Sequence, residues 1–211
     1  MKFDGVIFDL DGVLCRTDEL HLAAWCALAS RLGIKLPPDA AERTRGVGRM
    51  ESLDIVLGER SRGFSPAQKR ALAEEKNALY RQYLLRLTPA DAEPGARETL
   101  SELRRRGVKL AVASSSRNAP LIIEKLAMAP LLDAVVDGGM VSRSKPDPEV
   151  FLKAAAALGL PPARCAVVED AQSGLEAARR GGFCAVAYSP HARPLDAGIR
   201  ISSLPALAGL L

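Results

Sequence analysis

A regular alternation of short apolar runs with helical patterns is the feature that most limits how this chain can fold. The runs predict buried parallel strands at 5–11, 108–114, 164–170 and 183–188, and a weaker run predicts another at 132–138. Helices are predicted between them at 96–106, 117–128, 148–158 and 171–181. Strands that alternate with helices favour an α/β fold, with a doubly wound, Rossmann-like parallel sheet.

One long region interrupts this alternation. From Thr17 to about Leu87 the sequence contains no convincing strand, and it predicts helices at 18–32, 39–45, 50–58 and 66–86. We therefore predict a small α-helical cap domain, residues 17–87, inserted into a catalytic α/β core formed by residues 1–16 and 88–211. A chain of 211 residues is long enough for one domain with such an insertion.

Composition and charge exclude several classes of partner. The formal net charge is only +4, and the sequence has no basic arm or aromatic-rich basic patch, so we expect no nucleic-acid partner. No run approaches 18 apolar residues, and the N-terminal stretch does not resemble a signal peptide, so we expect no membrane partner. The four cysteines lack metal-binding spacing and are expected to be free thiols. We expect a cytoplasmic monomer.

Polar side chains follow three of the predicted strands at the points where the strands end. Asp9 and Asp11 follow the first strand, Ser114–Ser116 follow the second, and Glu169 and Asp170 follow the fourth. Lys145 precedes the helix predicted at 148–158. Because ligands of open parallel sheets bind beyond the carboxyl ends of the strands, we expect these groups to form one site.

The chemistry of this set points to phosphate. Four carboxylates crowded together raise one another's pKa unless a cation lies among them, and Mg²⁺ is the usual hard cation beside phosphate. Serines at a helix N-terminus form an anion site, so the combination favours phosphoryl transfer with an aspartate nucleophile. Taken singly, each signal has a plainer explanation, since Asp9 and Asp11 could form a turn, Asp170 an N-cap and Lys145 a solvated side chain. Their joint occurrence at strand ends favours a site.

Four segments in order, "FDLDGVL", "VASSS", "SKPDP" and "VVEDAQSGLEAA", resemble the motifs of the haloacid dehalogenase-like hydrolase superfamily. The resemblance implies that Asp9 is the nucleophile and Asp11 the general acid/base. It also implies that Ser114 and Lys145 hold the transferring phosphoryl group. The implied Mg²⁺ ligands are Asp9, Asp11 (through its carbonyl), Glu169 and Asp170. Dehalogenases lack the second aspartate, so Asp11 favours phosphate chemistry over halide displacement.

The predicted cap resembles the β-phosphoglucomutase-like branch of that superfamily in "ELHLAAWCALA", "RGVGRMESL" and "KNALY", as does "SSSRNAP" in the core. By this resemblance Lys76 contacts the sugar. The sugar and the phosphate that is not transferred are bound by Arg49 together with Arg45, Gly46, Val47, Gly48 and Ser52. Ser116, Arg117 and Asn118 hold that distal phosphate. The complete set of implied substrate-binding residues is Thr17, His21, Arg45, Gly46, Val47, Gly48, Arg49, Ser52, Lys76, Ser115, Ser116, Arg117 and Asn118.

Several of these cap residues have a second interpretation from the sequence alone. Lys76 shares a helical stripe with Leu72, so it is either a snorkelling lysine or a group that faces a pocket. His21 shares a stripe with Trp25, so it is either a core histidine or a site residue. Arg49, like Arg45, could simply be solvated unless the cap closes on the core.

The resemblance implies a mutase that interconverts β-glucose 1-phosphate and glucose 6-phosphate through an aspartyl-phosphate and a bisphosphate intermediate. A Mg²⁺-dependent sugar-phosphate phosphatase is the alternative, because the Asp9–Asp11 pair serves both reactions. A non-catalytic binding protein would require the loss of a catalytic group, and none is lost. Arg16, Ala171 and the Gly-rich segment "DGGMVSRSK" depart from the pattern without removing a catalytic group.

Overall fold

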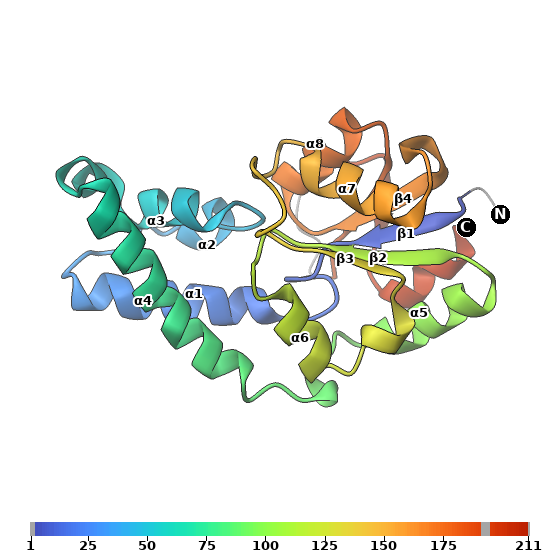
Figure 1. Ribbon diagram of the computed structural model, residues 1–211, viewed down its shortest axis with the longest axis horizontal. Coiled ribbons are helices and arrows are strands. Elements are labelled where there is room, and N and C mark those ends of the chain that lie inside the picture. Colours follow the sequence, from blue (N-terminus) through green and yellow to red (C-terminus); the bar gives the residue numbers. More distant parts are fainter. Residues whose placement is uncertain (1–2, 191–194, 211) are drawn as a thin grey trace.

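A parallel sheet forms one end of the molecule (Figure 1), as the sequence predicts, and it has six strands where the sequence predicts five. The computed structural model describes residues 3–190 and 195–210. The strand order is β3-β2-β1-β4-β5-β6. The strands are β1 (Gly5–Phe8), β2 (Lys109–Ala113), β3 (Ala134–Val136), β4 (Cys165–Glu169), β5 (Cys184–Tyr188) and β6 (Ile199–Ile201).

Strand β1 lies in the middle of the sheet, where Gly5 is in register with Lys109 of β2 and with Cys165 of β4. Successive side chains face opposite sides, so Val6 enters one apolar cluster and Ile7 the other. Both faces are covered by helices, which is why the strands are continuous apolar runs. The carboxyl end of β1 therefore opens at the centre of the sheet edge.

Four helices cover the sheet close to their predicted positions. They are α5 (Ala96–Arg105) and α6 (Ala119–Lys125) on one face, and α7 (Glu149–Leu158) and α8 (Gln172–Arg180) on the other (Figure 1). Helix α6 is shorter at both ends than the predicted 117–128. Asn118 lies outside the helix as its N-cap, and Ala127 ends it by adopting a positive φ of 51°.

The predicted all-helical region forms the other end of the molecule, away from the chain termini (Figure 1). Its helices are α1 (Thr17–Arg31), α2 (Ala40–Arg43), α3 (Arg49–Leu57) and α4 (Pro66–Leu84). Helix α4 begins at a capping box in which Ser65 Oγ accepts from the Gln68 backbone N–H. An apolar cluster that includes Trp25 and Leu53 joins the first, third and fourth helices.

Tyr80 and Leu84 at the end of α4 pack into the apolar cluster of the sheet rather than that of the helices. The boundaries of the predicted cap and core domains stay a prediction.

The two chain connections between these parts lie side by side. Glu93 N donates to Leu14 O (2.8 Å), and Cys15 pairs with Ala92 in an isolated antiparallel bridge. Arg16 Nε donates to Glu93 Oε2 at 3.1 Å, joining the two connections through their side chains. The unusual Arg16 of the sequence thus has a defined partner in the second connection.

Strand β6 and a short 3₁₀ helix near the C-terminus were not among the predicted elements. The 3₁₀ helices are η1 (Gly58–Gly63), η2 (Pro89–Asp91), η3 (Ala129–Leu131), η4 (Pro162–Arg164) and η5 (Leu204–Gly209).

All four cysteines lie in the described part of the chain, and none of them forms a disulfide. Within residues 3–190 and 195–210, no helix has the length and apolar character that a membrane crossing requires.

Candidate active site

The predicted catalytic groups meet at the carboxyl edge of the sheet. Lys145 Nζ donates to Asp9 Oδ1 and to Glu169 Oε1, both at 2.6 Å. The side chains of Lys145 and Glu169 are fully buried, and that of Asp9 is 6% exposed. The loop before α7 thus carries an ammonium group to the ends of β1 and β4, where it neutralises one of two buried carboxylates.

Burial raises the pKa of Asp9 well above its usual value, and the carboxylates of Glu169, Asp11 and Asp170 raise it further. Lys145 opposes this effect without reversing it. Burial alone would lower the pKa of Lys145, but Asp9 and Glu169 hold it above the ordinary lysine value. The site therefore has more negative charge than its lysine can balance.

Asp11 lies two residues beyond Asp9 and is held from both parts of the molecule. Thr17 Oγ1 donates to its Oδ1 (2.6 Å), and Ser114 Oγ donates to its Oδ2 (3.1 Å). Tyr80 OH is 3.3 Å from the same Oδ1, and His21 Nε2 is 3.6 Å from it. These contacts fix the orientation of a carboxylate that lines the cavity.

The four predicted metal ligands do not form a ready-made cage. Among the residues that the structure describes, no three His, Cys, Asp or Glu side chains converge as metal ligands. Mg²⁺ needs only one or two carboxylates, because waters and substrate phosphate complete its coordination. Asp9 Oδ1 and Glu169 Oε1 both lie 2.6 Å from the ammonium group of Lys145, so two carboxylates already share one cation there. Together with Asp170, this set of oxygen donors fits a divalent cation.

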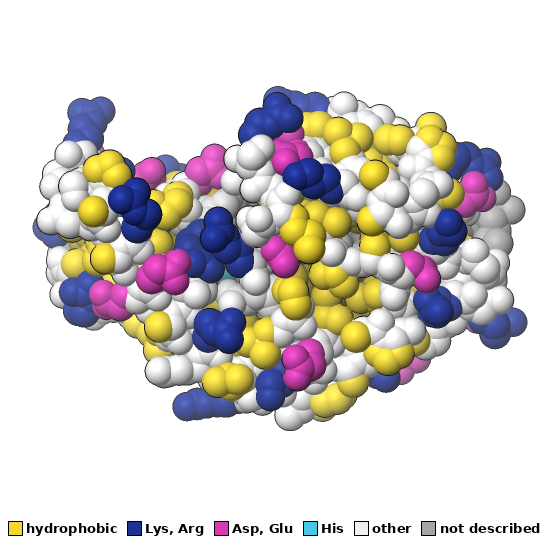
Figure 2. Space-filling view, viewed as in Figure 1, with side chains coloured by type: hydrophobic (Ala, Val, Ile, Leu, Met, Phe, Trp, Pro, Cys, Tyr) yellow, Lys and Arg dark blue, Asp and Glu magenta, His cyan; other side chains and the backbone are white. Residues whose placement is uncertain are grey.

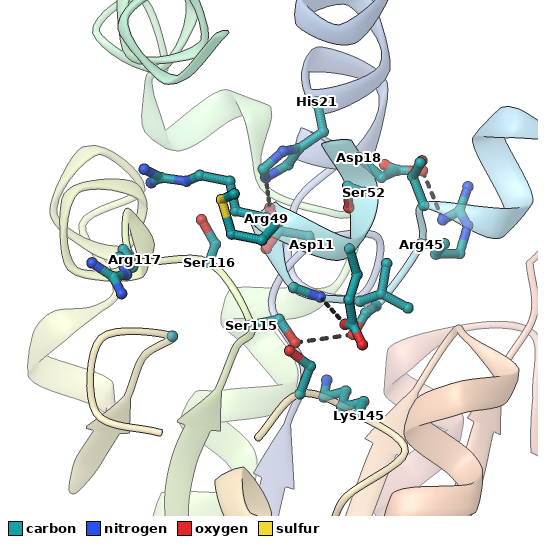
Figure 3. Close-up of a pocket in the computed structure, with 18 of the residues that line it drawn as sticks. Asp11, Asp18, His21, Arg45, Arg49, Ser52, Ser115, Ser116, Arg117 and Lys145 are labelled. Atoms are coloured by element: carbon teal, nitrogen blue, oxygen red, sulfur yellow. Dashed lines mark hydrogen bonds and ion pairs between the residues drawn. The ribbon is translucent and has the colours of Figure 1, made fainter. Parts of the chain in front are cut away.

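A cavity of about 400 Å³ separates this sheet edge from the helical part (Figure 3). Twelve of the thirteen predicted substrate-binding residues line it, and Thr17 is the exception. Asp9, Asp11 and Lys145 line the sheet side, whereas Ser114, Glu169 and Asp170 lie behind this lining. Figure 2 shows Lys and Arg side chains gathered at the hollow between the two parts. The predicted reaction centre and the predicted substrate-binding residues therefore face one enclosed space.

The segment 45–48 closes one side of this cavity by lying directly on the core. Ser115 Oγ donates to Gly46 O at 3.0 Å. Gly46 has a φ of 72°, and a side chain at Gly48 would collide with Ser144. The glycines are needed here for close approach of the backbone, which the sequence alone indicates only as a flexible turn.

Arg45 was predicted to bind substrate, but its guanidinium pairs with two carboxylates. Its Nη1 lies 2.7 Å from Asp18 Oδ2 and 2.5 Å from Asp170 Oδ2. Arg45 thus joins the helical part to the end of β4, next to the predicted metal ligands. A substrate-binding role for Arg45 stays a prediction.

Lys76 is buried and faces the cavity instead of snorkelling to solvent. It is 3% exposed, and its Nζ lies 2.7 Å from His21 Nδ1 and 4.6 Å from the ring centres of Trp25 and Tyr80. Burial lowers the pKa of Lys76 to about 7, and the nearby Arg49 adds to this effect. Burial also lowers the pKa of His21 well below its usual value. Lys76 and His21 are thus in direct contact on the cavity wall.

The cavity lining also includes polar residues that were missing from the predicted set, among them Asp18, Asn77 and Arg143. Asn77 was indicated by its inward helical stripe, but its partners depend on where α3 and the core lie. Asp18 reads as an ordinary acidic residue in the first turn of a helix, and Arg143 as a loop charge. Their sequence contexts carry no signal for a site.

The Lys76→Met variant should have a larger unfolding free energy than the wild type at low pH, and this difference should disappear at high pH. The folded-state pKa of about 7 lies below the ordinary value of 10.5, so the folded state binds fewer protons between these values. The cost of burying the charge is fully present below pH 7 and disappears as pH rises towards 10.5. We expect a gain of about 3 kcal/mol in unfolding free energy near pH 6.5.

Urea denaturation at several pH values measures this effect. Lys69→Met is the matched control, because Lys69 lies in the same helix but pairs with Asp54 at the surface. Its effect should stay within about 1 kcal/mol at every pH. If Lys76→Met gained the same unfolding free energy at every pH, or lost some, the lowered pKa assigned to Lys76 would be wrong.

Comparisons with known proteins agree with this arrangement. The family model "haloacid dehalogenase-like hydrolase" matches residues 3–182. The chain is 42% identical over 183 residues to β-phosphoglucomutase of Bacillus subtilis, covering 86% of this chain and 81% of that protein. It is 33% identical to a phosphorylated carbohydrates phosphatase of Thermotoga maritima, covering 85% and 82%. The crystal structure of β-phosphoglucomutase from Clostridium difficile superposes with a TM-score of 0.92 at 32% identity, covering 97% of this chain and 93% of that one. The chain belongs to the haloacid dehalogenase-like hydrolase family.

Proposed function

We propose that this protein is a phosphomutase that interconverts β-glucose 1-phosphate and glucose 6-phosphate. The observation that carries the proposal is the cavity between the two parts, with Asp9 and Lys145 at one side and Arg49 and Arg117 at another. Burial and the positive charge of Arg117 lower the pKa of Arg49, and its partner Glu74 opposes them. A sugar bisphosphate requires two anion-binding regions in one closed space. The 42% identical B. subtilis protein bears the name of this activity.

The proposed chemistry runs through two matched transfers. In the first transfer Asp9 attacks a phosphorus of glucose 1,6-bisphosphate, so that an oxygen–phosphorus bond forms on its carboxylate, the bond between phosphorus and the sugar oxygen breaks, and a sugar monophosphate leaves. Asp11 gives a proton to that leaving oxygen and removes one from the hydroxyl that attacks next. In the second transfer the 6-hydroxyl of β-glucose 1-phosphate takes the phosphoryl group from Asp9, which forms the bisphosphate again. The bisphosphate then binds in the opposite orientation, Asp9 takes the phosphoryl group from carbon 1, and glucose 6-phosphate leaves.

The other groups of the site support these transfers by position and charge. Lys145 and Ser114 lie beside the carboxylates of Asp9 and Asp11 and would stabilise the transferring phosphoryl group. Bound Mg²⁺, held by Asp9, Glu169 and Asp170, would supply further neutralisation of the phosphoryl charge. Ser115 and Ser116 line the cavity between the two anion-binding regions.

The competing proposal is a sugar-phosphate phosphatase, and the similarity to the T. maritima phosphatase supports it. In that reaction water accepts the phosphoryl group from Asp9. The closed arrangement of segment 45–48 on the core favours the mutase, because exclusion of water protects an aspartyl-phosphate from hydrolysis.

A product assay decides between them. The protein receives β-glucose 1-phosphate, Mg²⁺ and a trace of glucose 1,6-bisphosphate, and both products are followed. Glucose 6-phosphate should accumulate in large excess over inorganic phosphate. Inorganic phosphate as the main product would reject the mutase and favour the phosphatase.

The proposal extends to the cofactor, the assembly and the location. We infer that Mg²⁺ is the resident metal, that the enzyme acts as a monomer and that it works in the cytoplasm. Disulfide-free cysteines suit a reducing compartment.

A further inference from the structure

Asn118, in the loop that follows β2, is held by two side chains of helix α4. Arg81 Nη1 donates to Asn118 Oδ1 at 3.0 Å, and Asn118 Nδ2 donates to Asn77 Oδ1 at 2.9 Å. Asn118 is 4% exposed, so these bonds lie in a place that water reaches little. Both polar ends of one core side chain are therefore committed to the cap helix.

The chemistry of the donors fixes the orientation of both amides. A guanidinium group only donates, so the oxygen of Asn118 must face Arg81 and its nitrogen must face Asn77. Arg49 Nη2 also donates to Asn77 Oδ1, at 2.9 Å. Asn77 is thus the shared acceptor for one donor from α3 and one from the core loop.

The same loop carries the other groups proposed for the distal phosphate. The backbone N–H of Asn118 donates to Ser116 Oγ (3.2 Å), and the backbone N–H of Ser116 donates to Ser114 Oγ (3.0 Å). Fixing Asn118 therefore fixes the segment that holds Ser116 and Arg117. Arg49, which belongs to helix α3, donates to the same acceptor.

We propose that Asn77 and Arg81 are positioning residues that hold Arg49 and the 116–118 loop together. By doing so they make the enzyme prefer substrates whose distal phosphate or phosphorylated sugar binds between Arg49 and this loop. This inference rests on the proposed function for its substrate class. Neither residue needs to touch the reacting phosphorus. The competing explanation is that these residues form an ordinary stabilising contact between cap and core. It predicts that activity falls equally for all substrates when the contact is removed.

The test compares a sugar phosphate with 4-nitrophenyl phosphate, which has no second group for the cap to read. The variants are Asn77→Ala, Arg81→Met and the conservative Arg81→Lys. Arg70→Met is the matched control, since Arg70 is an exposed arginine of the same helix. Asn77→Ala improves helix propensity, so it stays informative if Arg81→Met folds poorly.

The two variants that remove the contact should raise KM for β-glucose 1-phosphate about tenfold, the effect of losing a hydrogen bond to a charged group. Hydrolysis of 4-nitrophenyl phosphate should change less than twofold, and Arg81→Lys should recover part of the loss. Small-angle scattering should show a larger radius of gyration for both variants. Arg70→Met should match the wild type in every measurement.

Equal losses on both substrates, or no loss on either, would overturn the positioning role. The proposed function fails separately, because only the wild-type product assay decides whether the sugar phosphate is isomerised or hydrolysed. If it is hydrolysed, phosphate release gives the same comparison of KM values. A selective rise in KM would then still support Asn77 and Arg81 as positioning residues.

Discussion

Replacement of Asp9 by Asn lowers phosphoryl transfer at least about a thousandfold, for β-glucose 1-phosphate and for 4-nitrophenyl phosphate alike. The amide keeps the size and place of the side chain at the end of β1 but is a poor nucleophile. Both substrates must fail together, because Asp9 acts on phosphorus and not on the sugar. Steady-state assays measure the loss, and mass spectrometry of peptides from trapped enzyme should find phosphate on Asp9 only in the wild type.

Asp4→Asn is the matched control, because it is the same substitution just before β1. Asp4 pairs with Arg164 at 2.6 Å, and both side chains are about half exposed. Activity should stay within about twofold, and stability within about 1 kcal/mol. Asp9→Asn activity close to that of Asp4→Asn would show that another group is the nucleophile.

The pattern of strands and helices could be predicted because burial dictates it. Strands covered on both faces must be continuous apolar runs, and the runs around Ile7 and Val167 have this form. Strand β6 could not be predicted in this way. It has three residues, pairs only with β5, and carries Arg200 on its exposed side. Such a short edge strand is determined by its neighbour rather than by its own sequence.

The membership of the candidate site was also predictable, since strand ends of a parallel sheet converge whatever else the chain does. The hydrogen bonds and ion pairs among the site residues could not be predicted. From the sequence, Arg45 could have faced the substrate instead of pairing with Asp170, and Arg81 could have been an ordinary surface arginine of α4. These contacts depend on how the helical part meets the core, and no local pattern records that placement.

Lys145→Met should destabilise the folded protein by about 3–5 kcal/mol at neutral pH, more than any surface substitution. Lys145 is the cation between two buried carboxylates, each 2.6 Å away. Its removal leaves Asp9 and Glu169 facing one another without compensation, in a place where burial already raises the pKa of Asp9. Because methionine fills a similar volume, the loss of stability would come from the missing positive charge and not from a cavity.

The pH dependence of this loss identifies its cause. Without Lys145 the folded-state pKa of Asp9 rises further above its unfolded value, so the folded state binds more protons. The stability of Lys145→Met should therefore be greatest at low pH and fall as pH rises through the folded-state pKa of Asp9. Added Mg²⁺ should restore part of the stability if these carboxylates hold the metal. Urea denaturation across pH, with and without Mg²⁺, measures both effects.

Lys153→Met is the control for the loss of a lysine from the same region. Lys153 lies on α7 and pairs with Glu149 at 2.8 Å, but its side chain is 46% exposed. Because water screens such a pair, its removal should cost no more than about 1 kcal/mol. If Lys145→Met were as mild as Lys153→Met, the carboxylates at the strand ends would have to be neutral or compensated without the lysine. The role assigned to Lys145, as the cation that balances the charge of Asp9 beside the cavity, would then be wrong.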